Sequence, residues 1–194
     1  QLDMVQFCVT SFVEGEDRLG DRHLYLERAY EFDKGLTLYL SIEPPYAKLI
    51  SRKFLEYHSI RFSEVAAGND VYFSAQLAIF GKNKRFSRKV VYHVSQNTKS
   101  ITATQTDRKN CCRISEQIKK VKLVKRETSM FYASFYLVRR NILPFIYVAI
   151  EAGHGSSREF AQLSREYKSE LPILARALGW FVARFRRLGK NRRG

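Results

Sequence analysis

Cysteine is scarce in this chain, and its placement argues against two common ways of stabilising a small domain. The 194 residues include three cysteines, namely Cys8 and the adjacent pair Cys111 and Cys112, and no C-x-x-C spacing occurs. An odd number of cysteines without paired spacing argues against a disulfide framework and against a structural zinc site. A reducing, cytoplasmic compartment is the simplest interpretation.

Long apolar runs and the common catalytic motifs are missing as well. The longest apolar run, residues 142–150, has nine residues, whereas a membrane-spanning helix needs about 20. No G-x-x-x-x-G-K-S/T, G-x-G-x-x-G, G-x-S-x-G, H-E-x-x-H or D-x-D pattern occurs, so these motifs give no support to the chemistries that they serve. The chain begins at Gln1 inside an apolar stretch, and we expect further sequence upstream, where a leader peptide would not be visible.

Acidic residues are depleted from the second part of the chain. Residues 1–80 contain 8 Lys/Arg and 12 Asp/Glu, a net charge of −4, whereas residues 81–194 contain 26 Lys/Arg and 7 Asp/Glu, a net charge of +19. A segment this basic predicts a polyanionic neighbour for the second part only: nucleic acid, anionic lipid or a phosphorylated ligand.

The apolar pattern predicts an α/β fold over residues 1–105. Three segments have the alternation or the apolar runs typical of strands: 2–13, 36–42 and 86–94. Such segments, separated by helical patterns, predict a sheet with helices packed on it. The adjacent prolines Pro44 and Pro45 are expected to end the second strand, because neither can donate a ladder hydrogen bond.

Two helices are predicted between these strands. The first covers residues 47–58, with Leu49, Phe54 and Leu55 facing the core, and the second covers the apolar stretch 68–81. Both have apolar residues at helical spacing, so each is expected to bury one face.

Residues 106–194 are predicted to form a basic α-helical extension. Apolar residues recur there at helical spacing in three sets: Ile114, Ile118 and Val121; Met130 or Phe131 with Phe135 and Val138; and Leu174, Leu178, Phe181, Phe185 and Leu188. The last set forms one stripe of a helix whose remaining surface is rich in arginine. Such a helix either packs its stripe on neighbouring helices or lies in a lipid headgroup layer.

Asp70 is the strongest candidate for a functional residue, because it stands in the first turn of the helix predicted over 68–81. Asn69 before it is a good N-cap residue, and a carboxylate in a first turn interacts favourably with the helix dipole. On this local pattern alone, helix initiation is the favoured role. The same position also keeps a carboxylate ionised and can direct it into a cleft, as a general base requires.

One ordered set of segments favours the role of general base for Asp70 over that of helix initiation alone. The stretch "PPYAKLISRKFLEYHSIRF" is followed by "GNDVYFSAQLAIFGK", then by "VVYHV" and "KSIT". In this order and at this spacing, the segments resemble the second half of a bacterial family 2 glycosyltransferase of the kind that acts in capsular, exopolysaccharide or lipopolysaccharide synthesis. The resemblance covers residues 1 to about 105, and the helical remainder is similar to the variable appendages of such enzymes.

The resemblance implies the C-terminal, acceptor-side half of a GT-A (Rossmann-like) domain. The donor-binding half, with the D-x-D that holds Mg²⁺ or Mn²⁺ against the diphosphate of a nucleotide-sugar, is then expected upstream of Gln1. This chain alone is accordingly expected to be inactive. The implied reaction is an inverting transfer of a sugar to a hydroxyl of a glycan or a lipid-linked acceptor in cell-surface polysaccharide synthesis.

The resemblance also assigns roles to four residues. Asp70 matches the carboxylate that serves as general base, and Asn69 is its partner in an Asn-Asp pair that replaces the more usual Glu-Asp. The catalytic aspartate keeps its second position in that pair, so the departure concerns Asn69 alone. Tyr46 and Lys48 belong to the element that precedes the acceptor cleft.

Two further expectations concern partners. The apolar stripe and the arginines of residues 172–194 predict peripheral contact with an anionic membrane, at the inner face of the plasma membrane in this setting. The alternative to an enzyme is a basic, non-catalytic module that binds nucleic acid or an anionic membrane surface. No recognition motif for nucleic acid occurs, and we therefore expect no nucleic-acid partner for the enzyme.

Overall fold

The computed structural model describes residues 2–13, 15, 26, 29–31, 33, 35–96, 106–140, 142, 146, 157–173 and 175–177. The chain divides into two compact units, one made of Gln1–Glu64 with Asp70–Thr104, and the other made of Val65–Asn69 with Gln105–Gly194. The first unit is mixed α/β, and the described residues of the second are mainly helical. The α/β character expected for the first part of the chain is therefore confirmed at this level.

A three-stranded mixed sheet forms the centre of the first unit. Its order is β2-β1-β3, with β1 at Met4–Val13, β2 at Lys48–Ile50 and β3 at Lys84–Gln96. β1 pairs antiparallel with β2 and parallel with β3, and the β1–β3 register shifts on both sides of Cys8. This irregularity changes the alternation along β1, so that Met4 and Gln6 before it and Val9 and Ser11 after it are all buried.

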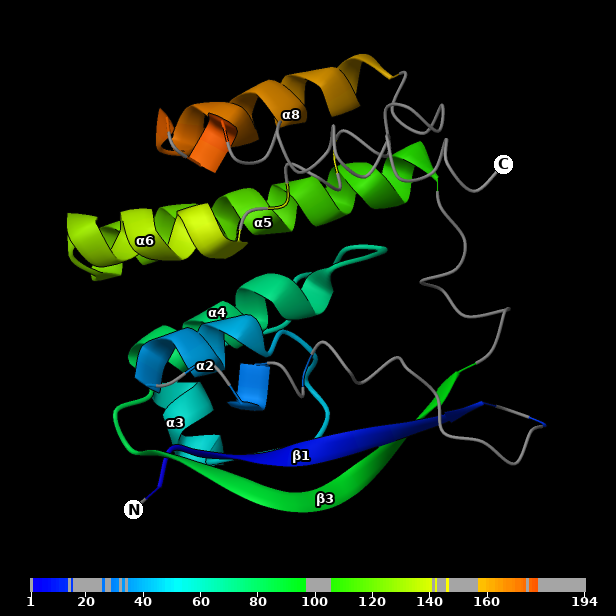
Figure 1. Ribbon diagram of the computed structural model, residues 1–194, viewed down its shortest axis with the longest axis vertical. Coiled ribbons are helices and arrows are strands. Elements are labelled where there is room, and N and C mark those ends of the chain that lie inside the picture. The colour runs from blue at the N-terminus through cyan, green and yellow to red at the C-terminus, as the bar shows by residue number, and fades with distance from the viewer. Residues whose placement is uncertain are drawn as a thin grey trace. The chain divides into compact units, whose positions relative to one another are not determined.

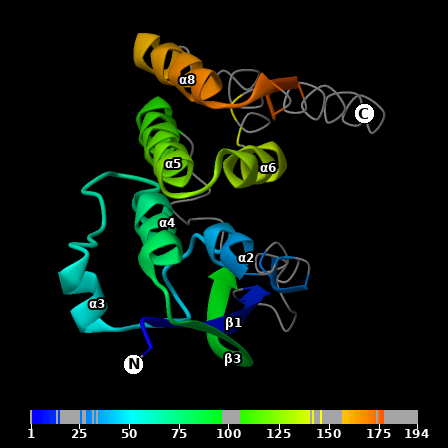
Figure 2. The same cartoon turned by 90° about the vertical axis from the view of Figure 1, so that its left-hand side faces the viewer.

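Helices cover one face of this sheet. α2 at Gly35–Ser41 and α4 at Asn69–Phe80 lie on the same side of β1 and β3, and the short helix α3 at Arg52–Tyr57 lies near the beginning of β1 (Figures 1 and 2). α4 ends at Phe80, directly before Gly81, where the sequence predicts the end of the helix. A Cβ atom at Gly81 would approach the carbonyl oxygen of Leu77 to 2.8 Å, so only glycine fits there without a shift of the backbone.

The strand predicted over residues 36–42 is wrong, because this segment forms α2. The alternating leucines that suggested a strand also contain a helical spacing: Leu38 and Ile42 are four residues apart and pack into one cluster with Val9 on β1. Leucine has a high helix propensity, so over seven residues the two patterns cannot be separated by periodicity alone.

The helix predicted over residues 47–58 is wrong in its first part. Lys48–Ile50 is the short strand β2, and the helix begins only at Arg52. Ser51 caps it, because the hydroxyl of Ser51 accepts a hydrogen bond from the backbone N–H of Phe54 at 3.4 Å. Leu49 therefore does not face the core and is 67% exposed, whereas Phe54 is buried as predicted.

Two hydrophobic clusters lie along β1. One contains Met4, Phe54, Ile60, Phe73 and Leu77. The other contains Val9, Leu26, Ala29, Leu38 and Ile42. The beginning and the end of β1 thus pack against different helices, and α4 belongs to the first cluster.

The buried and exposed leucines of this unit provide a direct test of the packing. Leu77 is fully buried, and we expect Leu77→Ala to lower the free energy of unfolding by about 2–5 kcal/mol through lost contacts and a residual cavity. Leu49→Ala is the matched control, and at its exposed position we expect a change within about 0.5 kcal/mol. Urea unfolding monitored by circular dichroism measures both values, and equal losses would contradict the assigned orientation of β2.

The described part of the second unit is built on the long helix α5, Asp107–Glu127, with α6 at Met130–Arg140 and α8 at Arg158–Glu170. Ile114, Ile118 and Val121 are buried on α5, as their helical spacing predicts. α8 packs along α5, and three ion pairs between described residues join them: Lys122 with Glu166 at 2.8 Å, Lys122 with Glu170 at 3.9 Å and Lys125 with Glu170 at 2.7 Å.

The apolar face expected for α6 is wrong. Met130, Phe131 and Phe135 are 86%, 84% and 54% exposed. The buried residues on this helix are instead Ala133, Tyr136 and Leu137. Aromatic residues occur on both sides of α6, so spacing alone did not identify the packed side.

The last predicted stripe, from Leu174 to Leu188, lies outside the described residues. In the part of the chain that the structure describes, no helix combines the length and the apolar character needed to cross a membrane. Cys8, Cys111 and Cys112 are not joined in disulfide bonds.

Candidate functional site

Asp70 lies in the first turn of α4 and is partly buried. Asn69 is the first residue of this helix and is exposed, and Gly68 precedes it with φ +77°. Asn69 is thus inside the helix and not at the N-cap position, where the sequence analysis had placed it. Gly68 suits the left-handed backbone, and a Cβ atom there would also lie 3.2 Å from the Cα atom of Arg113.

The turn between α2 and β2 is held by side chains at three successive carbonyl groups. The Lys48 ammonium donates to the carbonyl oxygen of Ile42 at 3.0 Å and also to that of Pro44. The hydroxyl of Ser74 on α4 donates to the carbonyl oxygen of Glu43, which lies between them. Prolines leave this turn with few backbone donors of its own, so these side chains satisfy carbonyls that have no ladder partner.

The Lys48 ammonium is desolvated by its position against this turn. Burial lowers the pKa of Lys48 to about 7, and the negative charges of Asp70 and Glu43 oppose the decrease. Lys48 and Asp70 are therefore close enough to interact electrostatically.

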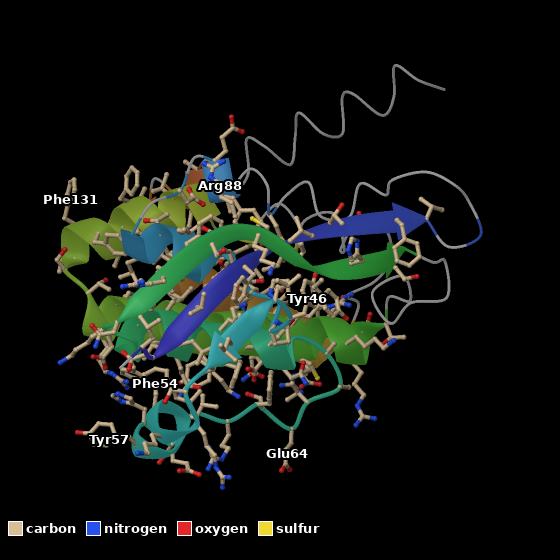
Figure 3. All side chains as sticks on the ribbon, turned by 90° about the horizontal axis from the view of Figure 1, so that it is seen from below. Tyr46, Phe54, Tyr57, Glu64, Arg88 and Phe131 are labelled. Atoms are coloured by element: carbon tan, nitrogen blue, oxygen red, sulfur yellow. The ribbon has the colours of Figure 1, made fainter. Side chains whose placement is uncertain are left out.

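Tyr46 occupies the same turn, beside the sheet (Figure 3). Its ring stacks on that of Tyr92 on β3, with the centroids 4.9 Å apart and the planes inclined by 6°. The next residue, Ala47, has φ +57°, which is uncommon for a residue with a Cβ atom. Its carbonyl oxygen accepts hydrogen bonds from the backbone N–H of Phe7 at 2.8 Å and from the amide of Gln6 at 3.2 Å.

Two of the four predicted site residues, Lys48 and Asp70, thus lie close enough to interact electrostatically, and Tyr46 lies in the same turn, two residues before Lys48. Tyr46 and Lys48 come from the turn and β2, and Asp70 comes from α4. Asn69 is adjacent in sequence and exposed. A partly buried carboxylate with a nearby ammonium, on a fixed turn, can accept a proton from a hydroxyl group brought next to it.

Sequence reasoning missed Ser74 and Glu43. Ser74 lies four residues after Asp70, so both side chains are on the same face of α4. A polar residue on an otherwise apolar helix, one turn after a candidate base, was a signal that could have identified it. Glu43 contributes through its backbone carbonyl and its charge, and its side chain type alone did not indicate this.

The described residues do not form a metal site. Among them, no group of three or more His, Cys, Asp or Glu side chains is placed to hold a metal ion. The resemblance places the ligands of Mg²⁺ or Mn²⁺ upstream of Gln1.

No family model, curated protein or solved structure matches this chain.

Proposed function

We propose that the chain supplies the acceptor-side half of an inverting glycosyltransferase, which moves a sugar from a nucleotide-sugar to a hydroxyl of a glycan or a lipid-linked acceptor. The observation that carries the proposal is the electrostatic interaction of Asp70 on α4 with Lys48 of the turn. The resemblance selects these residues from segments more than twenty positions apart, and Lys48 and Asp70 interact across that separation.

In the proposed reaction, Asp70 accepts the proton of the acceptor hydroxyl. The oxygen then attacks the anomeric carbon, the new glycosidic bond forms, and the bond from that carbon to the nucleoside diphosphate breaks with its electron pair leaving on the diphosphate. Positioned proton transfer of this kind contributes about 10²–10⁴-fold to the rate. Lys48 acts as a positioning residue, because its ammonium fixes the turn and interacts with the Asp70 carboxylate. In enzymes of this kind, a bound divalent ion offsets the charge that develops on the diphosphate.

The proposal is tested with the protein expressed together with the coding sequence that precedes Gln1. That sequence is expected to contain a D-x-D within a few tens of residues of Leu2. The purified protein is incubated with a panel of nucleotide-sugars and with glycan and lipid-linked acceptors, and release of the nucleoside diphosphate is measured. Acceptor-dependent release with at least one donor supports the proposal, and no release with any donor and acceptor contradicts it.

A second candidate function is favoured by one surface feature. No acidic residue occurs in residues 71–106, and Arg85, Arg88 and Lys89 are exposed on β3 (Figure 3). This strand suits a polyanion. Co-sedimentation with anionic vesicles, compared with a mobility shift on duplex DNA, distinguishes a membrane-binding module from a nucleic-acid-binding module. Binding to either one without any transferase activity would favour the non-catalytic alternative.

A further inference from the structure

A cleft lies at the opposite end of α4 from Asp70. It is a cleft of about 510 Å³ whose lining includes Asp3, Lys53, Tyr57, His58, Phe80 and Lys82. Asp70 and Phe80 are ten residues apart on one helix, so the two places are separated by about 15 Å. The cleft also lies where β1 and β3 begin, whereas ligands of open parallel sheets bind where strands end. It is therefore distinct from the site around Asp70.

Four of the residues that line the cleft carry rings that contact one another. The imidazole of His58 stacks on the ring of Phe80, with the centroids 5.1 Å apart and the planes inclined by 3°. Phe54 and Tyr57 both contact the same imidazole edge to face, with ring centroids 5.1 and 4.8 Å from that of His58. Phe54 is buried in the core, whereas Tyr57 is 84% exposed as a residue and its side chain projects from α3 (Figure 3). Tyr57 thus offers an uncovered ring face beside a cleft whose other rings are already packed.

The rim of the cleft is cationic. Lys53 and Lys82 both line it, and neither ammonium forms an ion pair with another described residue. The one acidic residue of the lining, Asp3, is already engaged, because its Oδ2 accepts hydrogen bonds from the backbone N–H groups of Lys82 and Asn83, each at 2.9 Å. The ammonium groups of Lys53 and Lys82 are therefore available to a ligand, whereas the Asp3 carboxylate is engaged by backbone N–H groups.

We propose that this cleft binds a phosphorylated ring compound, with its ring on Tyr57 and its phosphate between Lys53 and Lys82. A dianionic phosphate matches two ammonium groups better than a single carboxylate does. We expect the ligand to carry a ring because a ring, such as a nucleobase, packs favourably on an exposed aromatic side chain. Nucleotides and sugar phosphates share this chemistry. This site does not depend on the function proposed for Asp70.

Titration calorimetry on the full chain tests the proposal with three probes: uridine monophosphate, glucose 1-phosphate and inorganic phosphate. We expect saturable binding of at least one ring phosphate, and weaker binding of inorganic phosphate. The stronger of the two ring probes identifies the ligand as a nucleotide or as a sugar phosphate. Tyr57→Ala and Lys82→Ala are each expected to weaken this binding by about tenfold, and Tyr57→Phe is expected to retain it.

Two control variants keep the test specific. Arg52→Ala removes a cation from the same helix at a position outside the cleft lining, where Arg52 pairs with Glu56 at 2.8 Å, and it is expected to leave binding unchanged. Asp70→Asn is also expected to leave binding unchanged. Three results would overturn the proposal: no saturable binding of either ring phosphate, equal binding of inorganic phosphate with no effect of Tyr57→Ala, or loss of binding in Asp70→Asn but not in Tyr57→Ala.

Discussion

Asp70→Asn is expected to lower the rate of sugar transfer by about 10²–10⁴-fold, because the amide cannot accept the proton that the carboxylate accepts. The substitution keeps the shape of the side chain, so the free energy of unfolding should change by less than about 1 kcal/mol. The rate is measured as acceptor-dependent release of nucleoside diphosphate by the protein expressed with its upstream sequence, and stability is measured by urea unfolding.

Glu64→Gln is the matched control for this prediction. Glu64 is an exposed carboxylate in the irregular segment before α4 (Figure 3), and its removal changes the net charge by the same amount. We expect Glu64→Gln to retain the full rate. A full rate in Asp70→Asn, or an equal loss in both variants, would show that Asp70 serves only to begin the helix.

Lys48 is expected to make the stability of the fold rise with pH above neutrality. Its pKa is lowered from 10.5 to about 7 in the folded chain, chiefly by burial. Between these two values, the unfolded chain binds more protons than the folded chain, so the free energy of unfolding increases with pH, by up to about 1.4 kcal/mol per pH unit. Below the folded pKa, both states carry the proton, and this contribution to stability is lost.

The comparison with Lys48→Met isolates that effect. Methionine fills much of the same space without a titrating group. The free energy of unfolding of the wild type minus that of the variant should therefore increase from pH 7 to pH 9. Urea unfolding at several pH values gives this difference directly, and the slopes caused by other groups cancel. A difference that stays constant over this range would show that the ammonium remains solvated in the folded chain.

The elements that could be predicted from the sequence are those with a long, unambiguous pattern. β1, β3 and α4 each extend over ten or more residues, and their patterns distinguish strand from helix. α2 and β2 are short, with seven and three residues, and their conformation depends on contacts with β1. Val9 on β1 packs against Leu38 on α2 and against Ile42 directly after it, and no pattern within residues 36–42 contains that information.

Only those residues of the candidate site that have a local sequence signal could be predicted. Asp70 was identifiable from its place at the start of an apolar helix, and Tyr46 and Lys48 were identified by resemblance to a family. The bonds that fix the turn were not predictable, because the bond from Ser74 to Glu43 joins residues 31 positions apart. The burial that lowers the pKa of Lys48 likewise arises from the fold, and the residue type alone does not indicate it.

β3 has a further consequence for handling the protein. Among the described strands β3 pairs only with β1, so none of these strands covers its other margin, and an uncovered strand margin can pair with a second polypeptide. Two copies meeting there would place like guanidinium and ammonium groups against each other, and this repulsion keeps molecules apart at low ionic strength. Concentrated salt screens such charges over a few ångströms, so storage in high-salt buffer removes the protection that the arginines and lysines of this strand provide against aggregation.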